Sequence, residues 1–469
     1  MFDFGFDDFD DSTRKDHVQE LVETYENDGA STYLDSEDLE KISTYYFEQG
    51  QLRDALSVID RLIDEHPYTS DGWLRRGIIL NHLGRHEEAL DAYERALDIN
   101  PMDTESMVNR GITLDSLGRS TEALEVFEEV LSINPLHGEA LFNRGVTYER
   151  LDQLEEAVAT FEQCVDVQPE HPEAWYELGY CYDRLQENER SVACYDEHLD
   201  IDPYSQDAWY NRGIVLNRMG RYEAAAESYE MAIAIQEDFA SAHYNMGNAL
   251  ANQGNLEEAI ESYERVLDLE GPDASTHFNI GLAYEEMGNY RKARSHYQDA
   301  VKQEPAYPEA WYGLGCTHNV QGQFEKAREC FKQALELNPN AHDFWKAAGD
   351  AAFNANRLTE ALEKYEAALE RDESQRQTWL DYAEALFAAR RPKDALEAYE
   401  QALSLDPKSA GAYFRRAKAL LALGRSDESI RSLKRAFELD PSKEKEFQIA
   451  YPHLYQDAQV RRKLGLDRS

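Results

Sequence analysis

The chain has 469 residues, of which 92 are acidic and 48 are basic, so its net charge is −44. Nucleic acids and anionic membranes are bound through basic surface, and we therefore expect neither as a direct partner. The hydrophobic content of 42% exceeds that of a disordered chain, and no apolar run is long enough to span a membrane.

The first 35 residues precede the regular part of the sequence. Residues 1–11 contain four phenylalanines and five aspartates without helical spacing, and we expect an acidic, disordered N-terminus. They lack the basic start and apolar core of a secretory signal, which predicts a cytoplasmic protein. In residues 12–35, Val18, Leu21, Val22 and Tyr25 have helical spacing, which predicts a capping helix or degenerate half-repeat.

A proline then recurs with a period of 34 residues. With the proline as position 32, residues 36–443 form twelve tandem repeats in one register. A period of this length indicates an array in which each repeat packs only on its neighbours, so we expect a long binding surface rather than one enclosed catalytic pocket. The prolines are Pro67, Pro101, Pro135, Pro169, Pro203, Pro305, Pro339, Pro407 and Pro441, and the three missing ones are replaced by Glu237, Gly271 and Glu373.

Each repeat contains the pattern of two amphipathic helices, which we call helix A and helix B. Position 15 is glycine in eight repeats, which predicts a left-handed helix end between the two helices. Position 8 is glycine in nine repeats although glycine destabilises a helix, so we expect a close approach of helix B there. Alanine at position 20 would serve the same contact, and large aromatic residues at positions 4 and 24 would fill the space between repeats.

These patterns resemble the tetratricopeptide repeat family. The segment AWYNRGIVLNRMG from Ala208 is similar to its helix A, and EEALDAYERALDINP from Glu87 is similar to its helix B. The resemblance covers residues 36–443, about 87% of the chain. It implies an all-α fold, an α-solenoid in which antiparallel helix pairs form a right-handed superhelix with a concave groove lined by helix A. Residues 444–469, where Pro452 interrupts a helical pattern, are predicted to form C-terminal capping helices.

The resemblance implies that positions 2, 5, 6, 9, 12 and 13 of helix A face the groove. An asparagine at position 6 could pair with a peptide backbone, because its amide both donates and accepts hydrogen bonds. Such a file resembles the asparagine ladder in the O-GlcNAc transferase superhelix, although Glu177 interrupts it here and asparagine is common at this position in the family. The asparagines are Asn109, Asn143, Asn211, Asn245 and Asn279, and Asn248 is an isolated match to a carboxylate clamp.

Position 5 is aromatic in six consecutive repeats. These side chains either anchor a partner or pack against the next repeat, and the residue pattern leaves both readings open. Position 2 is acidic in eight repeats, which indicates either a rim that selects basic ligands or favourable charge at helix N-termini. The six aromatic residues are Phe142, Tyr176, Tyr210, Tyr244, Phe278 and Tyr312.

Signals for chemistry are missing from the sequence. It has no glycine-rich phosphate loop, no HExxH and no GxSxG motif, and its five cysteines include no CxxC pair. We therefore expect no enzyme activity, no cofactor and no metal. His243 and His277 replace tryptophan at position 4, which we interpret as packing, and the array is expected to be less regular between residues 237 and 277.

The sequence favours an interaction scaffold, or adaptor, that binds an extended or helical polypeptide segment in the groove of the array. Because the lysines before Lys292 are only Lys15 and Lys41, the partner is expected to be neutral to basic. The alternative is a non-catalytic regulatory or targeting subunit of an enzyme encoded elsewhere. The two hypotheses differ in whether the partner is an enzyme whose rate changes on binding.

Overall fold

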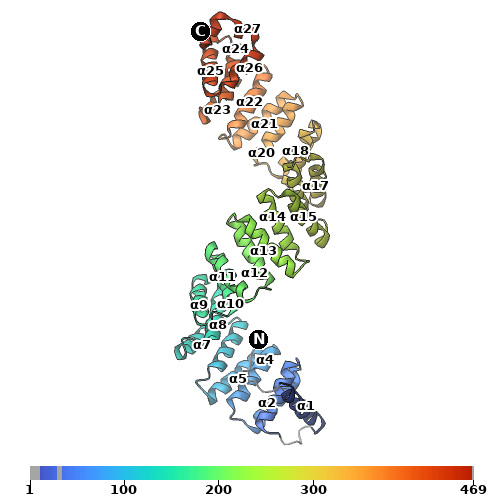
Figure 1. The fold of residues 1–469 in the computed structure, drawn as a ribbon, viewed down its shortest axis with the longest axis vertical. Coiled ribbons are helices and arrows are strands. Elements are labelled where there is room, and N and C mark those ends of the chain that lie inside the picture. The colour runs from blue at the N-terminus through green and yellow to red at the C-terminus, as the bar shows by residue number, and fades with distance from the viewer. Residues whose placement is uncertain (1–10, 29–33, 467–469) are drawn as a thin grey trace. The chain divides into compact units, whose positions relative to one another are not determined.

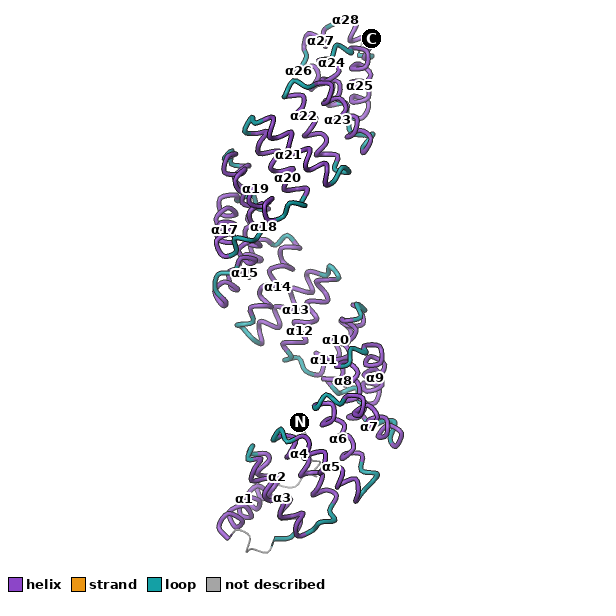
Figure 2. Tube along the Cα trace, turned by 180° about the vertical axis from the view of Figure 1, so that it is seen from behind, coloured by secondary structure: helices purple, strands orange, loops and turns teal. Residues whose placement is uncertain are grey.

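A computed structural model describes residues 11–28 and 34–466, and this part of the chain contains helices and loops but no strand. The chain divides into two compact units, which we call the N-terminal block, residues 1–235, and the C-terminal block, residues 236–469. Each block contains six repeats, and successive helices lie antiparallel (Figures 1 and 2). The fold is therefore the all-α solenoid predicted from the period. The expected disorder of residues 1–11 lies outside the described residues, except that Asp11 begins the first helix.

The N-terminal block consists of one leading helix and six helix pairs. In each pair the first helix is helix A and the second is helix B. The elements are α1 (Asp11–Asp28), α2 (Ser36–Glu48), α3 (Leu52–Glu65), α4 (Ser70–His82), α5 (His86–Ile99), α6 (Thr104–Ser116), α7 (Ser120–Ile133), α8 (Gly138–Arg150), α9 (Leu154–Val167), α10 (Pro172–Arg184), α11 (Asn188–Ile201), α12 (Gln206–Arg218) and α13 (Tyr222–Ile235).

The C-terminal block consists of six helix pairs followed by three short helices. Phe447 from the short helices is buried against the last repeat, and Pro452 stands in the first turn of α27. The elements are α14 (Ala240–Gln253), α15 (Leu256–Glu270), α16 (Ala274–Glu286), α17 (Tyr290–Gln303), α18 (Pro308–Val320), α19 (Phe324–Leu337), α20 (His342–Asn354), α21 (Leu358–Arg371), α22 (Arg376–Ala388), α23 (Pro392–Leu405), α24 (Ala410–Ala422), α25 (Ser426–Leu439), α26 (Ser442–Ala450), α27 (Pro452–Gln456) and α28 (Ala458–Leu464).

The glycine at position 8 lies under an aromatic ring from helix B of its own repeat. A Cβ atom added to Gly77 would lie 2.3 Å from Cε1 of Tyr93, and one added to Gly111 would lie 2.6 Å from Cε1 of Phe127. Both rings are fully buried. The predicted close approach at position 8 is therefore made by the ring at position 24, and a larger residue at Gly77 or Gly111 would require this ring or helix A to move.

Serine replaces glycine or alanine at this helix contact in three repeats. The hydroxyl of Ser43 at position 8 donates to the carbonyl of Ala55 at position 20, at 3.2 Å. At position 20, the hydroxyls of Ser191 and Ser429 donate to the position 8 carbonyls of Gly179 and Ala417, at 2.8 and 3.0 Å. All three serines are buried. Each buried hydroxyl thus has a hydrogen-bond partner across the helix pair, which removes the desolvation cost of an unsatisfied group.

Tryptophan at position 4 holds the loop that precedes its helix. The indole Nε1 of Trp175 donates to the carbonyl of Pro169 at 2.8 Å, and that of Trp209 donates to the carbonyl of Pro203 at 3.0 Å. Where His243 replaces the tryptophan, its Nε2 lies 3.1 Å from the carbonyl oxygen of Glu237. His243, which we interpret as a packing residue, therefore contacts the preceding loop as the tryptophans do. The less regular array expected between residues 237 and 277 stays a prediction.

Position 15 adopts the left-handed conformation in the turn between helix A and helix B. The eight glycines at this position have φ between 71° and 87°, as predicted. In the four other repeats the same turn is formed by Asp152, Gln186, Asn356 and Arg390, with φ between 58° and 62°. A residue with a Cβ atom pays roughly 1–2 kcal/mol in this conformation, so these four turns store strain that glycine would relieve.

Exchanges at position 15 should move stability in opposite directions. We expect Gln186→Gly to raise the free energy of unfolding by about 0.5–1 kcal/mol, because relief of the left-handed strain exceeds the added freedom of the unfolded chain. Gly84→Ala, at the equivalent turn, should lower it by about 1 kcal/mol. Urea titrations followed by circular dichroism would measure both, and a destabilised Gln186→Gly variant would contradict the assignment.

Candidate functional site

The first helices of successive repeats form a surface in each block, which we call the helix A face. In the N-terminal block it is formed by α2, α4, α6, α8, α10 and α12, and in the C-terminal block by α14, α16, α18, α20, α22 and α24. The predicted binding residues divide between the two faces, with Asn109, Asn143 and Asn211 in one block and Asn245, Asn248 and Asn279 in the other. That these residues bind a partner stays a prediction.

The six aromatic residues at position 5 are all half-buried. Each ring packs on the position 24 ring of its own repeat, with centroids 5.7–6.0 Å apart. Phe142 also stacks on His171 at the end of its own repeat at 4.7 Å, and Tyr312 stacks on Phe344 of the next repeat at 4.8 Å. One side of each ring is therefore held by the core, while the remaining part of the side chain faces solvent.

The asparagines at position 6 are tied to neighbouring groups of the chain. Asn211 Nδ2 donates to the hydroxyl of Tyr176 in the preceding repeat at 2.9 Å, and Asn279 Nδ2 donates to the hydroxyl of Tyr244 at 3.0 Å. Asn279 also donates to Asn248 Oδ1 at 3.3 Å. The same link between position 6 and the preceding position 5 thus occurs in both blocks.

Two other asparagines bond within their own helices. Asn109 Nδ2 donates to the carbonyl of Glu105 at 3.0 Å, and Asn143 Nδ2 donates to that of Glu139 at 2.8 Å. Asn109 is also buried, with 5% of its surface exposed. The amides therefore do not present a uniform set of groups to a peptide backbone, because their hydrogen-bonding partners differ from repeat to repeat.

Position 6 contacts the preceding repeat even where it is not asparagine. Arg75 donates to Thr44 Oγ1 at position 9 of the first repeat, at 3.2 Å. In the C-terminal block, Asp381 lies 3.3 Å from Lys346 Nζ, and Arg415 lies 3.5 Å from a carboxylate oxygen of Glu384. Position 6 thus links successive repeats, and we call these contacts the seam between repeats. Its residue type varies because amide, carboxylate and guanidinium groups can all reach positions 5 and 9 of the preceding repeat.

A double-mutant cycle at Tyr176 and Asn211 would measure this seam. Tyr176→Phe removes the hydroxyl acceptor and Asn211→Ala removes the donor, so the coupling energy between them isolates their hydrogen bond. We expect a coupling of about 0.5–1.5 kcal/mol in the free energy of unfolding. As a comparison, Tyr210→Phe combined with Asn143→Ala should give additive effects. A coupling energy near zero for Tyr176 and Asn211 would contradict the hydrogen bond that links their two repeats.

Glu177, which interrupts the asparagine file, lies beside Glu149 of the preceding repeat. Burial, and then the neighbouring charge of Glu149, raise the pKa of Glu177 to about 7. Burial also raises the pKa of Glu149, while a hydrogen bond from Glu177 acts in the opposite direction on it. Glu177 is therefore the proton donor of this pair, since two adjacent half-buried carboxylates repel each other when both are ionised.

The carboxyl pair should make stability fall as pH rises. The folded state holds the proton of Glu177 more tightly than the unfolded chain does between the ordinary pKa of 4.5 and a pKa of about 7, so stability is lost through that window. We expect Glu177→Gln to recover about 1–2 kcal/mol at pH 8 relative to the wild type and to change little at pH 4.5. Thermal melting across pH would test this, with the exposed Glu189→Gln as the control variant.

Position 13 was expected on the helix A face, but the three arginines that occupy it in successive repeats were not singled out from the sequence. Arg150 donates to the carbonyl of Asp115 at 2.9 Å, and Arg184 to Asp152 Oδ1 at 2.7 Å. Arg218 forms an ion pair with Asp183. All three acidic partners belong to the preceding repeat. Arginine in the same position of three successive repeats was the signal that could have found this file in the sequence.

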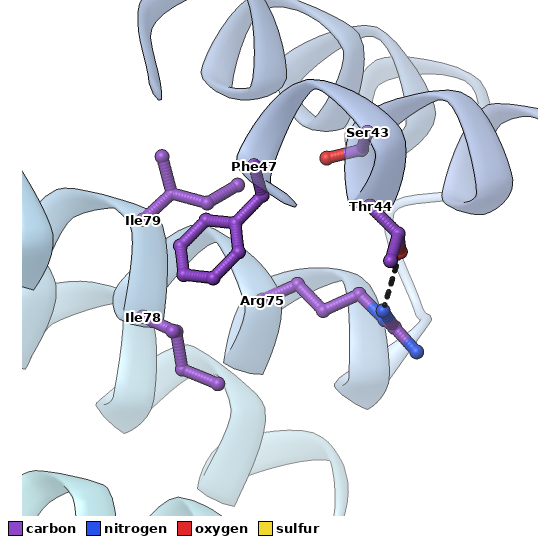
Figure 3. A pocket seen from close by; sticks show the side chains of 6 residues that line it. All are labelled: Ser43, Thr44, Phe47, Arg75, Ile78 and Ile79. Carbon is purple, nitrogen blue, oxygen red and sulfur yellow. Dashed lines mark hydrogen bonds between the residues drawn. The ribbon is translucent and has the colours of Figure 1, made fainter. Parts of the chain in front are cut away.

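A shallow pocket lies between the first two helices A, at one end of the helix A face (Figure 3). Phe47, Ile78 and Ile79 form its apolar side, and Arg75 reaches Thr44 on the other side (Figure 3). No residue of this pocket was singled out from the sequence. Its lining suits a small apolar side chain of a bound segment better than a charged ligand.

Within the described residues, no three histidine, cysteine or acidic side chains lie together as metal ligands, and none of their helices has the length and hydropathy to cross a bilayer. Burial raises the pKa of the Cys164 thiol to about 11 and that of Cys316 to about 12, so both stay protonated and poorly nucleophilic at neutral pH.

Family models match most of the chain. Two tetratricopeptide repeat models match residues 41–103, 108–163, 148–206 and 207–239, and the model of the cilia and flagella-associated protein 70 C-terminal domain matches residues 234–446. No curated protein matches the chain.

Solved structures are also similar to parts or most of the chain. The Cut9–Hcn1 hetero-tetramer of APC/C is 14% identical, with 96% of this chain and 98% of that chain covered and a TM-score of 0.40. The C-terminal part of a TPR repeat-containing protein from Cytophaga hutchinsonii is 18% identical, with 50% of this chain and 97% of that chain covered and a TM-score of 0.45. MamA from Desulfovibrio magneticus RS-1 is 24% identical, with 36% of this chain and 95% of that chain covered and a TM-score of 0.34.

Proposed function

The chain belongs to the tetratricopeptide repeat family, and from this premise we propose that it is a protein-interaction scaffold whose helix A faces bind a polypeptide segment of another protein. The observation that carries the proposal is the file of half-buried rings at position 5. It contains Phe142, Tyr176 and Tyr210 in the N-terminal block and Tyr244, Phe278 and Tyr312 in the C-terminal block.

These rings have the properties of binding anchors. Each is held on one side by the position 24 ring, so its orientation is restricted before a partner arrives. Pre-ordered aromatic side chains lose little conformational entropy on binding and bury much apolar surface, which is why tyrosine is enriched at interface centres. The amides beside them can hydrogen-bond a peptide backbone with their remaining donors and acceptors, because each asparagine offers more than one of each.

The charge of the chain supports a neutral to basic segment as the ligand. Residues 1–235 contain 53 acidic and 18 basic side chains, a net charge of −35, whereas residues 236–469 contain 39 and 30, a net charge of −9. The arginines at position 13 do not offset the negative charge of the N-terminal block, since Arg150, Arg184 and Arg218 are each paired with an aspartate. An acidic segment would be repelled from the N-terminal block and a basic one attracted.

Affinity capture from cell extract, read by mass spectrometry, would test the helix A face. We expect the variant with Asn211→Ala, Asn245→Ala and Asn279→Ala to keep its helical circular dichroism and to retain the partner at least about tenfold less well, a loss of about 1.4 kcal/mol. The matched control exchanges the exposed amides Gln298, Gln333 and Gln401 on helices B for alanine, and should retain the partner as the wild type does.

Two results would count against the proposal. Equal capture by the wild type and the triple asparagine variant would dismiss the amides as binding groups. With a purified partner, binding that stays constant between low and physiological salt would show that the acidity does not attract the ligand, because attraction between exposed charges is screened by salt.

A further inference from the structure

The loops that join a helix B to the next helix A carry exposed apolar side chains in the N-terminal block. Position 33, directly after the proline position, is Tyr68, Met102, Leu136 and Tyr204 in four of the five loops, with Glu170 in the fifth. These four side chains are 88%, 63%, 67% and 79% exposed. Because helices A and B alternate in direction, loops of this kind all lie at the same edge of the block, which we call the loop edge (Figure 2).

A carboxylate follows three residues after each apolar residue, in the first turn of helix A. Position 2 is Asp71, Glu105, Glu139 and Asp207 in the same four repeats. Burial is the main cause that raises the pKa of Glu105, and the charge of Asp103 raises it further. The charges of Asp71 and Glu139, in the two adjoining repeats, act in the same direction. The carboxylates of these three successive repeats are therefore near enough for their charges to interact, although Asp71 also forms an ion pair with Arg75 at 2.8 Å.

Folding does not require the apolar residues at position 33. The backbone N–H of Leu136 donates to Asn134 Oδ1 at 3.2 Å, and that of Tyr204 donates to Asp202 Oδ1 at 3.1 Å. In the C-terminal block, the N–H of Asn340 donates in the same way to Asn338 Oδ1 at 3.3 Å. The same turn is thus held by position 31 whatever side chain stands at position 33.

The C-terminal block lacks the apolar file on equivalent loops. Its inter-repeat loops carry Pro272, Ala306, Asn340, Ser374 and Lys408 at position 33. Single exposed apolar residues are common on protein surfaces, but here large ones recur at one repeat position and only in one block. The loop edge of the N-terminal block is therefore a surface property that the repeat itself does not impose.

We propose that the loop edge of the N-terminal block binds a segment of another protein in which basic and apolar residues alternate. The four apolar side chains would take up apolar residues of the segment, and the carboxylates at position 2 would pair with its lysines or arginines. The occupant is basic because the carboxylate file and the net charge of −35 of residues 1–235 leave no acidic ligand a favourable approach. This site borders the helix A face, to which position 2 belongs, and differs from the proposed function because it uses the apolar side chains at position 33.

Binding of a synthetic 16-residue peptide in which lysine alternates with leucine would test the loop edge on the full chain. The edge variant combines Tyr68→Ser, Met102→Ser, Leu136→Ser and Tyr204→Ser and leaves the charge unchanged. We expect its dissociation constant for this peptide to rise at least about tenfold at physiological salt, because the exchanged side chains lose their apolar contacts. A lysine–serine peptide of equal charge should bind the wild type and the edge variant equally.

The matched control variant exchanges four exposed apolar residues of the C-terminal block for serine. They are Val320, Leu337, Leu405 and Ile449, which are 59%, 42%, 44% and 82% exposed. The control variant should bind the lysine–leucine peptide as tightly as the wild type. So should the helix A variant with Asn211, Asn245 and Asn279 exchanged for alanine, which separates this site from the proposed function.

A charge variant provides a second, independent measurement. Asp71→Asn, Glu105→Gln, Glu139→Gln and Asp207→Asn keep the apolar file and should also weaken the lysine–leucine peptide at least about tenfold. The proposal is overturned if the edge variant binds this peptide as the wild type does, or if the control variant loses as much affinity. It is likewise overturned if sedimentation shows a wild-type dimer that the edge variant abolishes, because the occupant would then be a second copy of the chain.

Discussion

In nine of the twelve repeats, the distance between helix A and helix B is set by an aromatic ring at position 24, which lies against a glycine at position 8. In the second repeat a Cβ atom at Gly77 would come within 2.3 Å of the Tyr93 ring. The ring also supports the aromatic residue at position 5 of the same repeat, so core and surface are coupled. Because this contact recurs along the array, an interaction of a few atoms defines a surface that extends over many repeats.

The seams between repeats decide which groups remain for binding. Tryptophan at position 4 holds a carbonyl of the preceding loop, and in several repeats position 6 bonds position 5 or 9 of the preceding repeat. Side chains that looked available in the sequence, such as Asn211 and Asn279, therefore already contribute to packing. What remains for a partner is the exposed part of the position 5 rings, the spare hydrogen-bonding capacity of the amides, and the loop edge.

The two blocks use one scaffold for different surfaces. Their helix pairs share the ring-on-glycine contact, since Gly213 meets Tyr229 in the N-terminal block as Gly247 meets Tyr263 in the C-terminal block. Their net charges nevertheless differ, at −35 and −9. Positions 2, 13 and 33 can vary in this way because they lie outside the helix contact, so their residues can follow the needs of binding rather than those of folding.

The sequence by itself determined the phase of the array. The recurring proline, the glycines at positions 8 and 15 and the alanine at position 20 sufficed to predict two helices per repeat and a left-handed turn between them, because these features depend on local backbone preferences and on residue size. Gln186 and Arg390, which stand where other repeats have glycine, adopt the same left-handed turn.

Only the tertiary structure decided which side chains meet across repeats. Tyr176 and Asn211 are 35 residues apart, and whether their side chains bond depends on rotamers and on a separation of a few ångströms between helices. The raised pKa values of Glu177 and Glu149 likewise arise mainly from burial, which no periodic pattern displays. A period predicts which residues are equivalent, but it does not contain the distances between them, and hydrogen bonds and charge repulsion depend on those distances.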